Sequence, residues 1–126
     1  MLSSALTRGR ALAERLMVDS CSISRPGATV DELTGVPTWT PVYTGKCQMS
    51  TYEPQESNRE VSSALVTTQR YVLKLPVESY APQIGDVATI TAATYDANLV
   101  TRKFRVVALL HKTAATAYRL GAEEVL

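Results

Sequence analysis

The sequence predicts a mainly β fold: a small antiparallel β-barrel or sandwich of about six strands, with an N-terminal helix and one long inserted loop. Residues 87–92 and 103–110 are runs rich in β-branched and large apolar side chains, which favour strands. Further strand-like runs follow one another through turns, without a helical pattern between them, as in antiparallel folds. At 126 residues the chain has the size of a single domain.

Charge and composition argue against several classes of protein. The chain has 13 Lys and Arg against 12 Asp and Glu, so no overall field favours nucleic acid or an anionic membrane. No apolar run approaches the roughly eighteen residues that cross a bilayer, and no apolar segment typical of a signal peptide follows the first arginines. Two cysteines do not make a disulfide framework, so we expect synthesis in a reducing cytoplasm.

The first predicted element is a helix over residues 4–17, which Ser3 or Ser4 can cap. Apolar or small residues recur in it at spacings of three and four: Leu2, Leu6, Gly9, Ala13 and Leu16. This stripe is narrow, and two interpretations stay open. The helix either packs on its own domain or forms a terminal arm that docks on a neighbouring subunit.

Two strands are predicted before the long loop. Residues 18–25 alternate, with Cys21 and Ile23 on the inward face and serines between them. Pro26-Gly27 is expected to end this strand, and residues 28–37 to form the turn-rich tip of a hairpin. Residues 38–49 form the second strand, where Pro41 and Gly45 indicate an edge position or a bulge.

Three later runs, residues 70–77, 103–110 and 117–125, follow the two-residue period of a strand. The residues expected to share one face in each are Tyr71, Leu73, Leu75 and Val77, then Phe104, Val106, Ala108 and Leu110, and then Tyr118, Leu120 and Ala122. Gly85-Asp86 marks a turn into the strand 87–92.

Residues 50–69 differ in kind, because they are polar and follow neither period. A loop of this length is uncommon in so small a domain, and such loops are usually functional or disordered. Glu53 with Glu56 or Glu60 is a candidate for the general acid and general base of a catalytic pair. A solvated loop supplies no desolvation to separate the pKa values of two carboxyls, so a solvated surface is the better interpretation.

The sequence offers no other constellation for catalysis or metal binding. His111 is the single histidine and is expected to face solvent at a strand end. Cys21 and Cys47 are expected to be small buried residues, and no zinc set can be assembled. Asp96-Ala97-Asn98 begins like a calcium loop but lacks the later ligands, which indicates a turn. We therefore expect no enzyme, no metal and no cofactor.

Arg102, Lys103, Arg105 and Lys112 form the densest basic group in the sequence. On a barrel they suggest an oligonucleotide-binding face, but such faces need aromatic stacking platforms. Phe104 alternates with the basic residues and so points the other way. These charges are expected to face water or an acidic patch on a partner protein.

Several short stretches carry a resemblance to a known family. They are, in order, Ala-Leu-Thr-Arg-Gly-Arg-Ala-Leu-Ala-Glu-Arg-Leu-Met (5–17), Asp-Ser-Cys-Ser-Ile-Ser-Arg (19–25), Trp39, Val-Tyr-Thr-Gly-Lys-Cys (42–47), Gly85-Asp86, Asp96, Leu-Val-Thr-Arg-Lys-Phe-Arg-Val (99–106) and Glu-Glu-Val (123–125). In this layout the chain resembles the head-to-tail stopper, or head completion, proteins of long-tailed bacteriophages, particularly those infecting actinobacteria. The resemblance covers nearly the whole chain.

The resemblance implies a β-barrel subunit made in the host cytoplasm and built into the neck of the virion. There it would form a ring, with six-fold symmetry favoured over twelve-fold, beneath the portal and adaptor rings. The ring would close the DNA exit channel after packaging and present a surface to the tail. Its partners would be the head–tail adaptor, the tail terminator and packaged DNA without sequence specificity, with no membrane and no cofactor.

The family's closing element is an extended loop between two strands, a place that residues 50–69 occupy here. The candidate channel-closing residues are Tyr52, Glu53, Glu56, Asn58, Arg59, Glu60, Ala64, Leu65 and Val66. The candidate partner interface comprises Leu6, Arg8, Arg10, Arg15, Arg102, Lys103 and Arg105. The alternatives are a tail terminator or minor tail protein of the same virus type, an oligonucleotide-binding barrel, and a small hydrolase.

Overall fold

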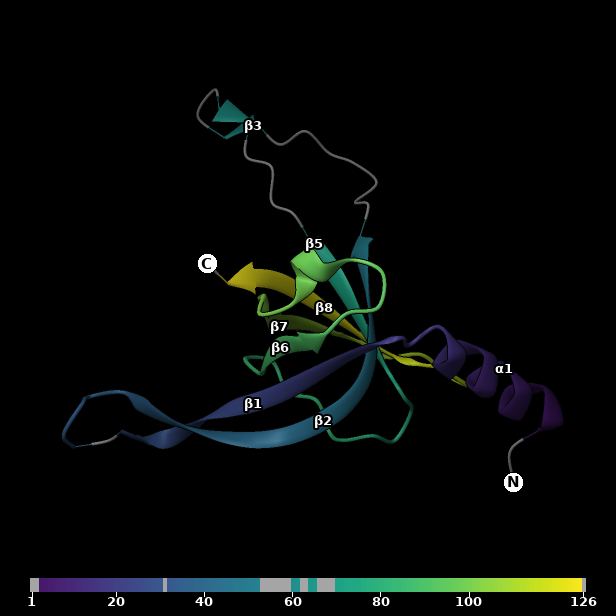
Figure 1. Cartoon of the computed structure of the whole chain (residues 1–126), viewed down its shortest axis with the longest axis horizontal. Helices are drawn as coiled ribbons and strands as arrows, with labels where there is room; N and C mark the ends of the chain where they lie inside the picture. The colour runs from purple at the N-terminus through teal and green to yellow at the C-terminus, as the bar shows by residue number, and fades with distance from the viewer. Residues whose placement is uncertain (1–2, 31, 53–59, 62–63, 66–69, 126) are drawn as a thin grey trace.

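The computed structural model describes residues 3–30, 32–52, 60–61, 64–65 and 70–125. Six strands close into an antiparallel barrel in the order β1-β2-β5-β8-β7-β6 (Figure 1). Their bounds are β1 Asp19–Val30, β2 Pro37–Tyr52, β5 Arg70–Leu75, β6 Val87–Ala92, β7 Lys103–Leu110 and β8 Tyr118–Val125. The predicted mainly β fold is confirmed, in its barrel form. Closure pairs the edges that an open sheet of these strands would expose.

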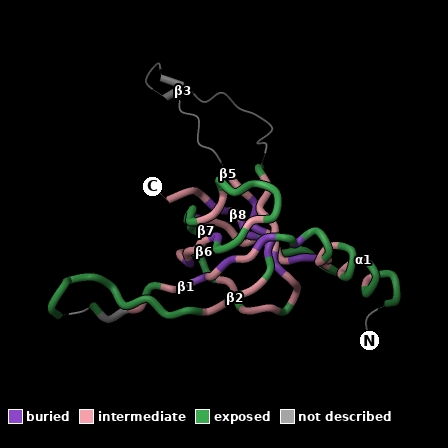
Figure 2. The backbone as a smooth tube through the Cα atoms, in the orientation of Figure 1, coloured by how far each residue is buried: buried purple, intermediate pink, exposed green. Residues whose placement is uncertain are grey.

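Inward side chains of all six strands fill the barrel. The largest apolar residues among the fully buried ones are Phe104, Ile23, Leu73, Leu75, Ile90 and Leu120. Phe104 meets Tyr71 edge to face, with the ring centroids 5.0 Å apart. Figure 2 shows that buried residues gather in the barrel, whereas the elements that leave it are mostly exposed. The two-residue period therefore predicts the interior of β5 and β8 correctly.

The two-residue alternation does not predict which side chains face inward at the end of β7. The pairing of β7 with β8 shifts between Val106 and Ala108, where an extra residue forms a β-bulge. Beyond the bulge, Leu109 lies opposite Leu120 and packs against the core, while Leu110 is 43% exposed. The prediction that Leu110 shares a face with Phe104 was wrong, because a bulge reverses the alternation that follows it.

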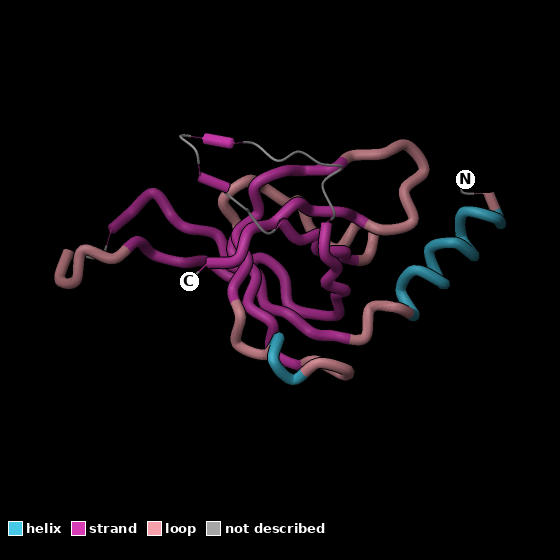
Figure 3. The backbone as a smooth tube through the Cα atoms, turned by 90° about the horizontal axis from the view of Figure 1, so that it is seen from above, coloured by secondary structure: helices cyan, strands magenta, loops and turns pink. Residues whose placement is uncertain are grey.

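Strand β1 continues past the predicted stop at Pro26-Gly27. It pairs with β6 only over Ser20–Ser24, and beyond this point β2 is its one neighbour among the described strands. A proline in a strand with a free edge need not remove a ladder hydrogen bond, so Pro26 is tolerated opposite Trp39. Residues 26–30 and 37–40 therefore form a two-stranded ribbon that leaves the barrel (Figures 1 and 3), and the segment 26–40 is called the arm below. The predicted irregularity at Pro41 is confirmed as a register shift in the same pair.

Helix α1, Ser4–Arg15, lies at the other end of the long axis from the arm (Figures 1 and 3). Ser3 caps it as predicted, since its Oγ accepts a hydrogen bond from the backbone N–H of Leu6 at 3.2 Å. The helix is two residues shorter than predicted, and Met17 is instead buried at the start of the barrel. No helix among the described residues is long and apolar enough to cross a membrane.

The inserted segment between β2 and β5 is shorter than predicted. Ser50, Thr51 and Tyr52 belong to β2 and pair with the first residues of β5, so the loop does not begin at residue 50. Within the segment, β3 (Glu60–Val61) and β4 (Ala64–Leu65) pair with each other in a separate two-stranded sheet. At the far end of β5 the strand stops at Leu75, because Pro76 cannot continue the ladder, and Val77 falls in a turn.

Candidate functional site

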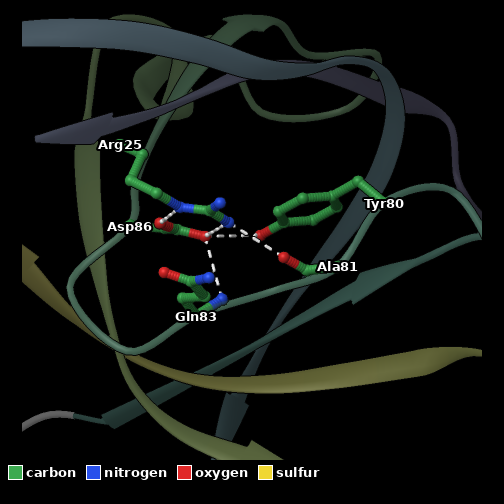
Figure 4. A network of polar contacts seen from close by, with 5 residues as sticks. All are labelled: Arg25, Tyr80, Ala81, Gln83 and Asp86. Carbon is green, nitrogen blue, oxygen red and sulfur yellow. Dashed lines mark hydrogen bonds and ion pairs between the residues drawn. The ribbon is translucent and has the colours of Figure 1, made fainter. Parts of the chain in front are cut away.

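Polar contacts gather where the arm leaves the barrel (Figure 4). The guanidinium of Arg25 donates two hydrogen bonds to the carboxylate of Asp86, with Nε–Oδ1 at 2.8 Å and Nη2–Oδ2 at 3.1 Å. Nη2 also donates to the carbonyl of Ala81 at 2.8 Å. The Oδ2 atom of Asp86 accepts further bonds from the backbone N–H of Gln83 at 3.0 Å and the hydroxyl of Tyr80 at 3.4 Å. Both carboxylate oxygens are thus satisfied, and residues 80–86 are held against the base of the arm.

The pair is asymmetric in burial, since the side chain of Asp86 is fully buried and that of Arg25 is 29% exposed. The hydrogen bonds to Asp86 raise the pKa of Arg25 above its ordinary value. Sequence analysis alone assigns Gly85-Asp86 to a turn, which Gly85 makes at φ +100°, and misses the ion pair. The sequence does contain a signal for this ion pair. Arg25 follows the inward-facing Ile23 by two residues, and Asp86 precedes the inward-facing Ala88 by two residues, so the two-residue period of a strand places both on the inner face.

Two tyrosines extend this network. Tyr43 of β2 stacks on Tyr80 with the ring centroids 5.7 Å apart, and its hydroxyl donates to the carbonyl of Lys46 at 2.7 Å. Desolvation by burial raises the pKa of Tyr43 to about 12. Burial, together with the charge of Asp86, raises the pKa of Tyr80 as well. Both phenols therefore remain protonated donors at neutral pH and serve to hold the loop.

The two cysteines behave as the sequence predicts. Cys21 and Cys47 are free thiols, and both are fully buried in the barrel. A hydrogen bond with Cys21, added to desolvation, raises the pKa of the Cys47 thiol. A thiol that stays protonated and buried is a poor nucleophile and a poor metal ligand, so this pair is part of the core.

A groove of about 560 Å³ opens between the loop after β5, the end of β7 and the start of β8. Its apolar lining includes Tyr80, Pro82, Leu110, Ala117, Tyr118 and Leu120. Four exposed residues with polar side chains also line it: Glu78, His111, Lys112 and Arg119. His111 is exposed, as predicted. The groove has the size of sites that enclose a small ligand or several side chains.

Polar contacts join helix α1 to the barrel, and none of the helix residues is buried. Arg10 donates from Nε to the carbonyl of Ala115 at 3.1 Å, and Glu14 pairs with Lys46 at 3.0 Å. Leu12 and Leu16 are 58% and 62% exposed. The helix thus contacts its own barrel without contributing a buried residue to the core, and its docking on a neighbouring subunit stays a prediction.

Deleting residues 2–15 is therefore expected to lower the free energy of unfolding by no more than about 2 kcal/mol. The lost contacts include the Arg10–Ala115 hydrogen bond, worth about 1 kcal/mol, and the exposed Glu14–Lys46 ion pair, worth less than about 1 kcal/mol, and no buried side chain of the helix is removed. Urea unfolding of the truncated and full-length chains measures the difference. Loss of the cooperative transition on truncation would instead make the helix part of the folding core.

The basic residues predicted as a partner interface do not form one surface. Lys103 and Arg105 are exposed near the start of β7, where Arg102 pairs with Glu124 at 2.6 Å. Lys112 follows the other end of that strand, which spans roughly 27 Å at 3.4 Å per residue. The helix residues Leu6, Arg8, Arg10 and Arg15 lie on the side of the β7–β8 turn, since Arg10 contacts Ala115 there. The interface predicted from these residues is thus divided between two regions.

The buried ring of Phe104 is oriented as predicted, away from the basic side chains of β7. Phe104 therefore cannot serve on that surface as one of the stacking platforms that an oligonucleotide-binding face requires. Asp96-Ala97-Asn98 is confirmed as a turn, because Asp96 Oδ1 accepts from the backbone N–H of Asn98 at the start of a short 3₁₀ helix, Ala97–Leu99.

The candidate channel-closing residues are only partly placed. Tyr52 ends β2, Glu60 belongs to β3, and Ala64 and Leu65 form β4, all described by their backbone pairing. The other members of the set lie outside the described residues: Glu53, Glu56, Asn58, Arg59 and Val66. Over the part of the chain that the structure describes, no group of three His, Cys, Asp or Glu side chains is arranged to hold a metal ion.

The fold defines the chain as a small closed antiparallel β-barrel protein with three elements attached to it: the helix, the arm and the segment inserted between β2 and β5. Residues 9–123 match DUF6093, a family of unknown function, and the chain belongs to that family. Comparisons with curated proteins and with solved structures gave no match.

Proposed function

We propose that the chain is a structural protein of a bacteriophage neck: a ring-forming head-to-tail stopper that closes the DNA exit channel after packaging and joins the adaptor to the tail. The observation that carries this proposal is the closed barrel with a long segment inserted between β2 and β5. This is the place at which the stopper proteins that the sequence resembles carry their closing loop.

The distribution of burial supports an assembly role. The interior of the barrel is apolar, and the fully buried carboxylate of Asp86 is paired with Arg25, so that pair stabilises the fold and is not free for chemistry. Apolar side chains are exposed on the helix and the arm instead, at Leu12, Leu16 and Trp39. Exposed apolar residues on projecting elements are typical of surfaces that bind other proteins.

Glutamates in the inserted segment would assist the release of DNA. The segment contains Glu53, Glu56 and Glu60 against the single base Arg59 between residues 53 and 69. In a ring these carboxylates would approach the axis, where they repel phosphates and keep DNA from adhering to the channel. The acidic side chains and the channel-closing role are therefore compatible.

The experiment that tests this function omits the protein from an infection by the virus that encodes it, and then adds the purified chain back. For a stopper, omission should give filled heads that leak DNA and do not join tails, and addition of the full chain should restore joining. A tail terminator, the alternative within the same virus type, would give tails of irregular length while the heads keep their DNA. Normal virions in the absence of the chain would reject both roles.

A further inference from the structure

We propose that the arm of one copy docks into the groove of a neighbouring copy, so that the chains associate head to tail. This inference specifies the subunit contact of the ring and takes its biological setting from the proposed function. It depends on the exposure of the arm, the lining of the groove, the charges of the two surfaces and their positions on the barrel.

The arm carries apolar side chains that are partly or largely exposed to solvent. Val30, Leu33, Val36 and Trp39 are 54%, 95%, 53% and 45% exposed. Among the described strands, β1 pairs with β2 alone beyond Ser24. An isolated two-stranded hairpin is marginally stable in water, so an arm of this kind gains from a second surface.

The groove offers a matching surface. Its volume of about 560 Å³ and its lining of Pro82, Leu110, Tyr118 and other apolar residues can accommodate an aromatic and an aliphatic side chain from outside. A buried aromatic anchor surrounded by polar groups is the usual centre of a protein–protein contact.

The charges of the two surfaces are complementary. Residues 26–40 contain Asp31 and Glu32 and no Lys or Arg, so the arm is acidic. The groove carries Lys112 and Arg119 against Glu78, together with His111, so its net charge is positive. Such complementarity selects the partner and the orientation of docking more than it adds affinity.

The arm and the groove lie on different parts of the chain, so we infer that the arm reaches the groove of a second copy and that the copies associate head to tail. The arm leaves one end of the long axis, whereas the groove includes Ala115, which contacts helix α1 at the other end (Figures 1 and 3). The part of β1 in the arm, residues 26–30, spans roughly 16 Å at 3.3 Å per residue, which carries the tip of the arm away from its own barrel toward an adjacent one. The groove borders the loop held at the base of the arm, at Tyr80 and Ala81, whereas the tip of the arm projects away from the barrel, so the two surfaces are different parts of one chain. Two different surfaces on one chain generate a ring when the rotation between copies closes.

Cysteine cross-linking of the full chain tests this contact in solution, without any viral partner. One variant carries Leu33→Cys on the arm, and another carries His111→Cys at the groove. Both native cysteines are buried, so disulfide formation reports on the introduced pair. The two variants, mixed under mild oxidation, are expected to give a mixed disulfide dimer in at least about tenfold excess over a mixture of Leu33→Cys with Lys103→Cys, because Lys103 is exposed at the other end of β7 from the groove.

A second substitution identifies the anchor. Trp39→Ala in the Leu33→Cys chain should reduce the mixed dimer about tenfold, whereas Thr40→Ala on the same exposed stretch should leave the yield unchanged. Circular dichroism checks that each variant is folded. Disulfides formed chiefly between two Leu33→Cys chains would indicate arm-to-arm pairing and overturn the inference, as would a mixed yield no higher than that of the control. Either result leaves the neck function to be judged by the omission experiment alone.

Discussion

Filled heads should lose their DNA when residues 53–69 are replaced by a short Gly/Ser linker, while the barrel still folds and still joins the neck. The linker begins after Tyr52 and ends before Arg70, so it spares the paired ends of β2 and β5. The barrel core draws on β1, β2, β5, β6, β7 and β8 and should keep its stability. The segment is the element assigned to closure, so the expected effect is near-complete loss of retained DNA, measured as the nuclease-sensitive fraction of packaged genomes.

A Gly/Ser linker of the original length tests whether closure depends on the length of the inserted segment or on its side chains. If the channel is closed by pairing between neighbouring segments, the long linker should leak as the short one does, because glycine and serine have low β propensity. Replacement of Glu53, Glu56 and Glu60 by glutamine keeps the length and the other side chains. That variant should retain DNA and release it more slowly on triggering, since the repulsion of phosphate is removed. Heads that keep their DNA with the short linker would place closure elsewhere.

Arg25→Met should lower the free energy of unfolding by about 3–5 kcal/mol, a large fraction of the stability of a small domain. The substitution preserves most of the side-chain volume but leaves the fully buried carboxylate of Asp86 without its cation. Asp86→Asn should cost less, about 1–3 kcal/mol, because the guanidinium of Arg25 is 29% exposed and can turn to water. Urea unfolding of the three chains gives the comparison.

Arg15→Met is the matched control, because Arg15 is exposed on the helix and its loss should change stability by less than about 0.5 kcal/mol. An effect of Arg25→Met as small as that of the control would show that the pair contributes little to folding. Equal effects of Arg25→Met and Asp86→Asn would contradict the asymmetry expected from the burial of the two side chains.

Much of the barrel could be predicted because inward and outward side chains alternate along regular strands. Leu73, Leu75 and Leu120 follow that rule and are buried. Leu110 does not, because the bulge after Val106 depends on how β7 meets β8, and no pattern within β7 alone records it. The length of β1 was underestimated for a similar reason: whether Pro26 ends a strand depends on whether the strand has a neighbour on that side.

The site was less predictable than the fold. The pair of Arg25 and Asp86 joins residues 61 positions apart, and each looks like an ordinary strand-end residue on its own. The groove is formed by three segments that meet only when β5, β7 and β8 are neighbours in the barrel. The unusual composition of the segment between β2 and β5, in contrast, is local and can be read from the sequence directly.

Imaging of isolated necks at side-chain detail tests the central claim most directly. The account predicts a closed ring of copies of this barrel between the adaptor and the tail, with residues 53–69 of each copy directed at the axis and blocking the channel. A neck whose density is fully explained without this chain, or a ring of it at the far end of the tail, would contradict a head-to-tail stopper.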